Sequence, residues 1–274
     1  TGLPEQYLNV GIAEQNGAGV AAGLATCGRI PFVVTYAAFG SMRICEMIRQ
    51  EICYPKLNVK IACSHGGVTP ANDGASHQCI EDMGIMRTLP NMTVVMPADY
   101  TSAKALVKAA AAWDGPVYLR FTRDAVPVLY DEEDTFEIGK AKILREGGDV
   151  TLIANGDTVR LALEAADNLQ KKGISARVLD MHTIKPLDEK AVLDCIRSTK
   201  AIVTVEDHNI YNGLGSAVAE LVSENGGARM RRVGIQDQFG QSAPYERLLE
   251  MNGITTENIV RQAEELLEQK SQIV

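Results

Sequence analysis

The chain has 274 residues, 46% of them hydrophobic and 23% charged, which is the balance of an ordinary folded protein with room for two domains. Its net charge of −8 argues against nucleic acid as the main partner, because phosphate binding needs clustered lysine and arginine. No apolar run is long enough to span a membrane and no leader opens the chain, so we expect a cytoplasmic protein with six reduced cysteines.

The first half alternates short β-branched runs with helical patterns. Four runs are predicted to be buried strands: 31–35 (PFVVT), 58–63 (NVKIAC), 93–96 (TVVM) and 117–121 (VYLRF). Helical patterns separate them at 41–52, 80–88 and 100–112. Apolar runs separated by helices indicate parallel strands covered on both faces. No strand pattern precedes 31–35, so we expect either that residues are missing from the front or that another chain completes the sheet.

A polar segment, 131–134 (DEED), interrupts this rhythm and is predicted to be a linker. After it, strands are expected at 150–154, 176–179, 201–205 and 230–234, with helices at 158–171, 188–197, 216–223 and 256–269. The prediction is therefore two successive three-layer α/β/α domains with mostly parallel sheets, covering residues 1–130 and 131–274.

Glu14 stands in NVGIAEQN, just ahead of an Ala- and Gly-rich stretch that runs to Gly28. Small residues let backbones approach closely, so we expect this carboxylate to enter a tightly packed interior. Burying an ionised carboxylate without a partner is costly, so the group either binds a proton or meets a matched donor. A bound heterocycle with a ring nitrogen could share that proton. The alternative is a helix-start acid that interacts with the helix dipole.

Polar groups follow several predicted strands, where ligands bind in open parallel sheets. The segments are 36–39 (YAAF), 64–67 (SHGG), 73–78 (DGASHQ) and 120–123 (RFTR). The nearby set of Cys63, His65, His77 and Cys79 also suggests zinc, but structural zinc sites usually space their ligands more widely. We therefore expect no metal ligand in this chain.

These segments resemble a known family. NVGIAEQN, TYAAF, NVKIACSHGGV, NDGASHQCIEDMGIMRTLPNM and PVYLRFTR resemble the pyrimidine-binding domain of transketolase. VLDMHTIKPLD, VTVEDHNIYNGLGSAVAE and LLEMNGIT resemble the C-terminal domain of the same enzyme. The resemblance covers nearly the whole chain in the same order. It implies thiamine diphosphate as cofactor and an activity in pentose phosphate metabolism.

The resemblance assigns the cofactor side of the site. It implies that Glu14 hydrogen-bonds N1′ of the cofactor's aminopyrimidine ring, a desolvated, charge-assisted contact. Tyr36 and Phe39 match the aromatic positions that pack on that ring, where a flat π-face is needed. Core packing at a strand end is the alternative for both rings. Arg43, one turn further on, is expected to form a helix or subunit-interface ion pair.

The substrate side follows in the same way. His65 and His77 match histidines that line the substrate channel, and imidazole suits such work because its pKa lies near working pH. Asp73 matches the aspartate that bonds a sugar hydroxyl, although an Asp before Gly can simply form a turn. Arg123 matches the arginine that clamps the substrate phosphate with its planar fork of donors. Arg120, inside the strand run, is expected to pair structurally.

The second half carries a weaker signal. Glu206, Asp207 and His208 end a predicted strand, and Gly213–Gly215 open a helix, a pattern that looks like a ligand cleft. Glycines alone are a weak signal and can also serve close packing. In this family the domain mainly supports the dimer, so no catalytic residue is assigned to it.

One family feature is absent from the sequence. Transketolases bind Mg²⁺ and the diphosphate through a Gly-Asp-Gly…Asn motif in a separate N-terminal domain, and no GDG occurs here. The resemblance therefore implies half an active site. We expect the C-terminal subunit of a split transketolase, joined to an N-terminal subunit that holds Mg²⁺, in an α2β2 assembly. Its substrates would be sugar phosphates, between which it would transfer a two-carbon ketol group.

Two alternatives stay open. The first is another thiamine diphosphate enzyme, such as deoxyxylulose-phosphate synthase, which shares GIAEQ, or the β subunit of a 2-oxo-acid dehydrogenase. The SHGG and DGASHQ segments favour transketolase over these. The second is an α/β subunit without catalysis that only scaffolds a partner, against which the intact Glu14, His65, His77 and Arg123 speak.

Overall fold

The computed structural model describes residues 3–271, with side chains described to residue 268. Its first half contains, in chain order, η1 (Pro4–Gln6), α1 (Glu14–Thr26), β1 (Phe32–Tyr36), η2 (Phe39–Arg43), α2 (Cys45–Met47), η3 (Ile48–Cys53), β2 (Lys60–Ser64), η4 (Ala71–Asp73), α3 (Asp82–Thr88), β3 (Thr93–Val95), α4 (Tyr100–Ala112) and β4 (Val117–Arg120). None of the helices in the described part of the chain is both long and apolar enough to cross a bilayer.

The second half continues with β5 (Lys142–Arg145), β6 (Val150–Ala154), α5 (Thr158–Lys171), β7 (Ala176–Asp180), β8 (Thr183–Lys185), α6 (Glu189–Ser198), β9 (Ala201–Asn209), α7 (Leu214–Asn225), β10 (Arg229–Ile235), α8 (Tyr245–Met251) and α9 (Thr256–Ser271). All eight expected strands are present. β5, β8 and α8 were not predicted from the sequence.

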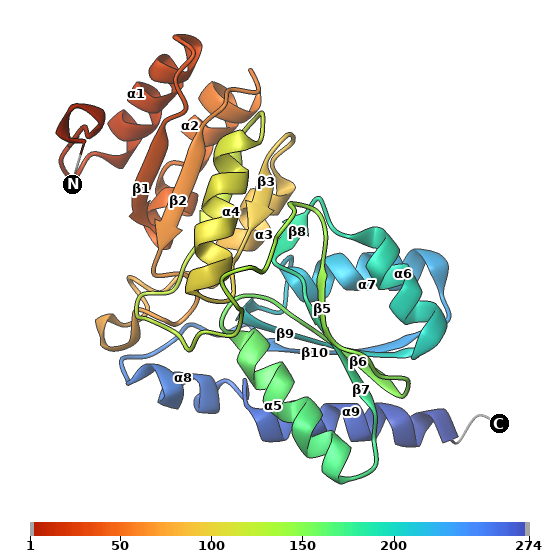
Figure 1. Ribbon diagram of the computed structural model, residues 1–274. Coiled ribbons are helices and arrows are strands. Elements are labelled where there is room, and N and C mark those ends of the chain that lie inside the picture. Colours follow the sequence, from red (N-terminus) through yellow and green to blue (C-terminus); the bar gives the residue numbers. More distant parts are fainter. Residues whose placement is uncertain (1–2, 272–274) are drawn as a thin grey trace.

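The strands form two sheets, as Figure 1 shows. The first has the order β1-β2-β4-β3-β8, with four parallel strands and β8 antiparallel to β3. The second has the order β10-β9-β6-β7-β5, again with four parallel strands and one antiparallel edge strand, β5. The expected fold of two mostly parallel α/β sheets is confirmed. β8 comes from the second half of the sequence, so a cut at residue 131 would remove a strand from the first sheet.

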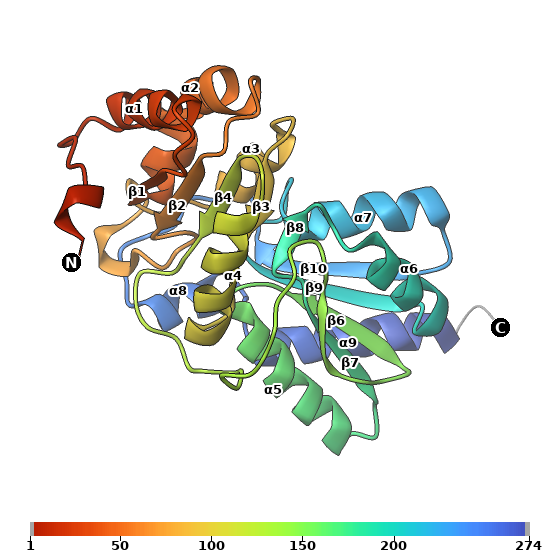
Figure 2. The same ribbon diagram turned by 45° about the horizontal axis from the view of Figure 1, so that its top comes forward.

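Helices cover both faces of each sheet, because alternate residues of a buried strand point to opposite sides. In the first sheet, Tyr118 packs in the core that contains α1 and α3, whereas its neighbours Val117 and Leu119 pack against α4. In the second sheet α5 and α9 lie on one side and α6 and α7 on the other (Figure 2). The core beneath α1 and α3 is continuous with the core beneath α6 and α7, which joins the two halves.

The beginning of the chain differs from the expected tightly packed interior. α1 buries Ala18, Ala21 and Ala22 on one face, and most of its other residues are partly or fully exposed. β1 is the edge strand next to it and hydrogen-bonds only to β2 among the described strands. Val34 on this edge is 75% exposed. The small residues of α1 therefore pack against β1 and η3 on one side. Apolar side chains at this end of the sheet, Ile12, Leu24 and Val34, stay exposed and form an apolar margin.

Candidate active site

Three neighbouring parallel strands of the first sheet have their carboxyl ends side by side, and a predicted site residue lies at or just after each end. β1 ends at Tyr36, β2 leads into His65, and β4 leads through Phe121 into Arg123. Because the order β1-β2-β4 makes these strands neighbours, the side chains that follow them gather in one place. Three of the four predicted polar segments, 36–39, 64–67 and 120–123, therefore lie at the same end of the sheet.

Four rings form an aromatic wall, which consists of Tyr36, Phe39, His65 and His77. Tyr36 stacks on His65 with ring centroids 3.7 Å apart and planes 17° from parallel. It is also stacked with Phe39 at 6.1 Å, and His77 meets the Phe39 ring edge-on at 5.7 Å. Each aromatic contact of this kind adds about 0.5–1.5 kcal/mol to burial. The wall therefore combines the predicted cofactor-facing rings with the predicted substrate-facing histidines.

A serine directly precedes each of these histidines and contacts its Nδ1. The Ser64 hydroxyl lies 2.8 Å from Nδ1 of His65, and the Ser76 hydroxyl lies 2.9 Å from Nδ1 of His77. His65 adopts φ of 65°, an uncommon left-handed conformation that histidine tolerates better than most side chains. Burial, and then the charge of Arg123, lower the pKa of His65. Both effects favour the neutral form of the His65 imidazole.

Glu14 is the first residue of α1 and its side chain is only 12% exposed. Its Oε2 lies 3.3 Å from the Arg43 guanidinium, which in turn sits 4.4 Å over the Phe39 ring. Oε1 takes no hydrogen bond from any residue in the described part of the chain. Arg43 thus forms an ion pair, but its partner is Glu14 in α1, and not a residue of its own helix or of another subunit as expected. The sequence contained no signal for that pairing, because 29 residues separate the two.

Arg123 and Asp73 pair with each other. The Arg123 guanidinium donates to the Asp73 carboxylate at 2.9 Å and to the Pro70 carbonyl at 2.7 Å. Both side chains are about one-third exposed, so this is a surface ion pair of modest strength. Gly74 follows Asp73 with φ of 76°, as a turn requires. The two predicted substrate-binding residues are therefore neighbours at the rim of the site.

Arg120 has the structural role that its place in a strand suggested. It is fully buried, its Nε lies 3.0 Å from Asp82, and it donates to the carbonyls of Cys79 and Asp207 at 3.2 and 2.8 Å. Tyr118 donates to the same Asp82 carboxylate at 2.7 Å. The buried Arg120–Asp82 ion pair therefore packs against the loops that carry the histidines.

The cleft suggested by Glu206, Asp207 and His208 is filled in the folded chain. All three side chains are fully buried at the carboxyl end of β9. Glu206 accepts from the backbone N–H groups of Leu214 and Gly215 at 2.7 and 2.8 Å, and burial raises its pKa to about 7. A Cβ at Gly213 would overlap this carboxylate. The glycines therefore serve close packing, and the interpretation as a ligand cleft is wrong.

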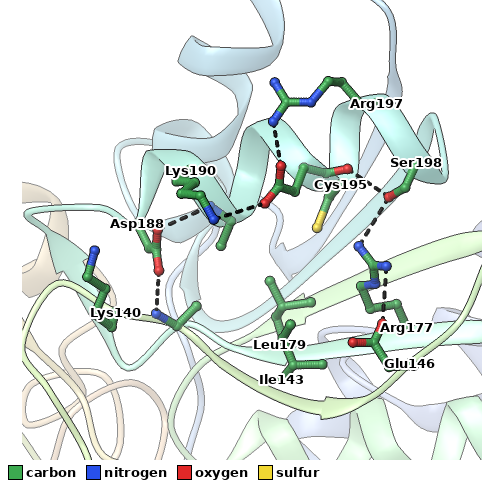
Figure 3. A pocket seen from close by; sticks show the side chains of 13 residues that line it. Lys140, Ile143, Glu146, Arg177, Leu179, Asp188, Lys190, Cys195, Arg197 and Ser198 are labelled. Carbon is green, nitrogen blue, oxygen red and sulfur yellow. Dashed lines mark hydrogen bonds and ion pairs between the residues drawn. The ribbon is translucent and has the colours of Figure 1, made fainter.

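A separate hollow lies between β5, β7 and α6 (Figure 3). It has a volume of ≈ 650 Å³ and carries both signs of charge, but these charges are largely paired. Arg177 bonds Glu146 at 3.1 Å, and Arg197 and Lys190 both pair with Asp194. Paired charges leave few free groups with which this hollow could bind a ligand.

No group of three or more His, Cys, Asp or Glu side chains within residues 3–268 has a geometry that could hold a metal ion.

The fold and the site together define a two-sheet α/β protein with a shielded carboxylate beside an aromatic and histidine-lined wall. Residues 2–128 match the family model of the transketolase pyrimidine-binding domain, and residues 139–259 match that of the transketolase C-terminal domain. The chain belongs to the transketolase family, in which it corresponds to a C-terminal section.

Known relatives agree with this placement. A putative transketolase C-terminal section from Methanocaldococcus jannaschii is 47% identical over 94% of this chain and 82% of its own length. A 6-deoxy-6-sulfo-D-fructose transketolase subunit from Clostridium sp. is 45% identical over 98% and 84%. A 1-deoxy-D-xylulose-5-phosphate synthase from Geobacter sulfurreducens is 39% identical over 98% of this chain but 42% of its own.

A solved structure of a split gene transketolase, described as an inactive β4 tetramer, superposes with a TM-score of 0.92. It is 48% identical, and the match covers 97% of this chain and 86% of that one. The resemblance to transketolase is therefore confirmed at the level of fold and family.

Proposed function

We propose that this chain is the C-terminal subunit of a split transketolase, which reversibly transfers a two-carbon ketol group from a ketose phosphate to an aldose phosphate. The observation that carries the proposal is the placement of Glu14. Its carboxylate is shielded from solvent, Oε1 accepts no hydrogen bond from residues 3–268, and it lies on the side of the site where Arg43 covers Phe39.

These residues fit thiamine diphosphate. Glu14 would share a proton with the ring nitrogen of the aminopyrimidine in a charge-assisted hydrogen bond, which is strong in a shielded place. Phe39 and Tyr36 would supply the flat faces against which the ring packs. The cofactor, when bound, carries the two-carbon unit covalently and stabilises the charge that develops on it.

The remaining residues would handle the sugar. His65 and His77 would exchange protons and hydrogen bonds with its hydroxyl and carbonyl oxygens through Nε2, because each Nδ1 already faces a serine hydroxyl. Asp73 would bond a sugar hydroxyl. Arg123 would hold the terminal phosphate, for which its planar fork of donors is suited.

A second polypeptide would complete the site. The chain carries no Gly-Asp-Gly motif, so Mg²⁺ and the diphosphate would be held by an N-terminal subunit, in an α2β2 assembly. An exposed apolar margin beside the site supports this, since Ile12, two residues before Glu14, is 96% exposed and Val34 is 75% exposed. The relative described as an inactive β4 tetramer fits a β chain that needs such a partner.

The test is a reconstitution with the N-terminal subunit that carries the Gly-Asp-Gly…Asn motif. The mixture should transfer a ketol unit when thiamine diphosphate and Mg²⁺ are present, and this chain alone should not. Glu14→Gln should abolish transfer, while the complex assembles normally by size-exclusion chromatography. Glu46→Gln, an exposed glutamate in the nearby helical segment, is the matched control and should retain the wild-type rate. Normal transfer by the chain alone would contradict the half-site proposal.

One other activity has a specific observation in its favour, the 39% identity to a 1-deoxy-D-xylulose-5-phosphate synthase. Supplying pyruvate and glyceraldehyde phosphate to the reconstituted complex distinguishes it from transketolase, which needs a ketose donor. A scaffold without catalysis would be indicated instead if Glu14→Gln left the activity within a few-fold of wild type.

A further inference from the structure

The two loops that carry the site histidines are joined to each other. Gly67 and Cys79 exchange both backbone hydrogen bonds, with Gly67 N–H donating at 2.7 Å and Cys79 N–H donating at 2.9 Å. Each of these residues lies two positions after a histidine, His65 in the first loop and His77 in the second. Whatever holds this bridge therefore holds both imidazoles.

Asp207, from the second sheet, lies directly beneath the bridge. It is fully buried at the end of β9, and its two oxygens accept from the Val68 N–H at 3.0 and 3.2 Å. A Cβ at Gly67 would overlap its carboxylate, so only glycine allows this approach. Burial, and then the nearby Asp157, raise the pKa of Asp207. The first histidine loop thus rests on a side chain from the other half of the molecule.

The same half also contacts the second histidine loop. Gln78, the residue after His77, donates from its amide to the Gln241 carbonyl at 2.9 Å. A Cβ at Gly240 would overlap the Gln78 side chain, and one at Gly74 would crowd the Ser242 hydroxyl. The segment 240–242 therefore packs against the 73–78 loop, and Asp207 packs against the loop that carries His65.

We propose that Asp207 is a positioning residue for His65, so that the C-terminal half sets the geometry of the site as well as supporting assembly. Asp207 touches the backbone of the loop and never the imidazole, so it acts by fixing the loop against the Tyr36 ring. The consequence for turnover rests on the proposed transketolase function, whereas the effect on His65 itself does not.

The first test uses the full chain alone and reads the imidazoles by NMR. The sequence has four histidines, and His65→Asn and His77→Asn assign the two in the site. In Asp207→Ala, the loop loses its acceptor and His65 becomes better solvated, so its titration midpoint should move upward, towards the ordinary histidine value. Asp207→Asn keeps an acceptor oxygen for the Val68 N–H and should retain the wild-type titration.

The matched control is Asp180→Ala. Asp180 is also a fully buried carboxyl at a strand end of the second sheet, but it bonds Tyr130 and contacts neither histidine loop. Both alanine variants should lower the melting temperature, and only Asp207→Ala should shift His65. If Asp207→Ala does not fold, Gly67→Ala disturbs the same contact from the loop side and should shift His65 in the same direction. An unchanged His65 in the folded variant, or an equal shift in the control, overturns the proposal.

The second test measures turnover in the complex reconstituted with the N-terminal subunit. Asp207→Ala should lower kcat/KM for the sugar substrates by about 10- to 100-fold, because small displacements of a substrate-facing group are costly. The control should stay near wild type. If the titration midpoint of His65 shifts while turnover is unchanged, the positioning role is supported and the proposed transketolase function is contradicted. The two proposals can therefore fail separately.

Discussion

Tyr36 stacks on His65 almost face to face, with 3.7 Å between their ring centroids. The pair joins the end of β1 to the end of β2, which are hydrogen-bonded neighbours with Tyr36 opposite Ser64. One aromatic side chain therefore holds an imidazole and also borders the place proposed for the cofactor. The Tyr36 ring thus packs against the imidazole of a residue with left-handed backbone geometry.

Tyr36→Ala should impair His65 more than Tyr36→Phe does. Phenylalanine keeps the ring that stacks, and alanine removes both the ring and about 0.5–1.5 kcal/mol of aromatic contact. In the reconstituted complex we expect kcat/KM to fall about tenfold for Tyr36→Ala and to stay within about twofold for Tyr36→Phe, measured by steady-state kinetics. Equal loss in both variants would indicate that the hydroxyl, and not the ring, matters.

Arg123→Ala should weaken binding of phosphorylated aldoses. A hydrogen bond from a guanidinium contributes about 1.5–3 kcal/mol to the free energy of binding an anion. KM for a phosphorylated acceptor should therefore rise about 10- to 100-fold. KM for an aldehyde without phosphate should change little, and comparing the two acceptors isolates the phosphate contact. Arg123→Lys keeps the charge without the fork and should fall between wild type and alanine. The same loss for both acceptors would place Arg123 elsewhere in the mechanism.

Asp180 should make stability depend on pH. Burial raises its pKa to about 7 in the folded state, against about 3.9 in an unfolded chain. The folded state therefore binds this proton more tightly, so the stabilising contribution is complete below about pH 4 and is lost as the pH rises through 7. Asp180→Asn should melt progressively higher relative to wild type between pH 4.5 and 8.

Comparing wild type with Asp180→Asn cancels the pH dependence that other titrating groups give to the melting temperature. His182, for example, has a pKa lowered to about 4 by burial and acts in the opposite direction, but it is present in both. Melting temperatures recorded by circular dichroism at each pH test the expectation. A difference between the two proteins that does not change with pH would show that the Asp180 carboxyl stays ionised.

Arg120→Met should destabilise the fold strongly. Removing one member of a buried ion pair leaves the other uncompensated, so the free energy of unfolding should fall by about 3–5 kcal/mol. Arg123→Met, three residues along on the surface, should change it by about 0.5 kcal/mol or less. Urea unfolding of the chain alone measures both, and similarly small effects in the two variants would contradict a stabilising role for the buried ion pair. Arg120→Met with Asp82→Leu should recover part of the loss.

Much of this molecule could be predicted from local patterns. Val150–Ala154 and Tyr100–Ala112 were expected at the bounds they adopt, because buried strands and capped helices depend on residues close in sequence. The site segments were found because chain order places them after strands. β8 could not be predicted: its three residues pair with β3 from almost ninety residues away, and only packing of the two halves brings them together.

The sequence by itself determined the α/β class, the family and the residues that follow the strand ends, since periodicity and motif spacing are properties of neighbouring residues. Only the tertiary structure decided that Arg43 pairs with Glu14, that Tyr36 stacks on His65, and that Asp207 supports the histidine loop. Those contacts join segments separated by about thirty to 140 residues, and their geometry depends on sheet order and on which side chains the shared core brings within a few ångströms.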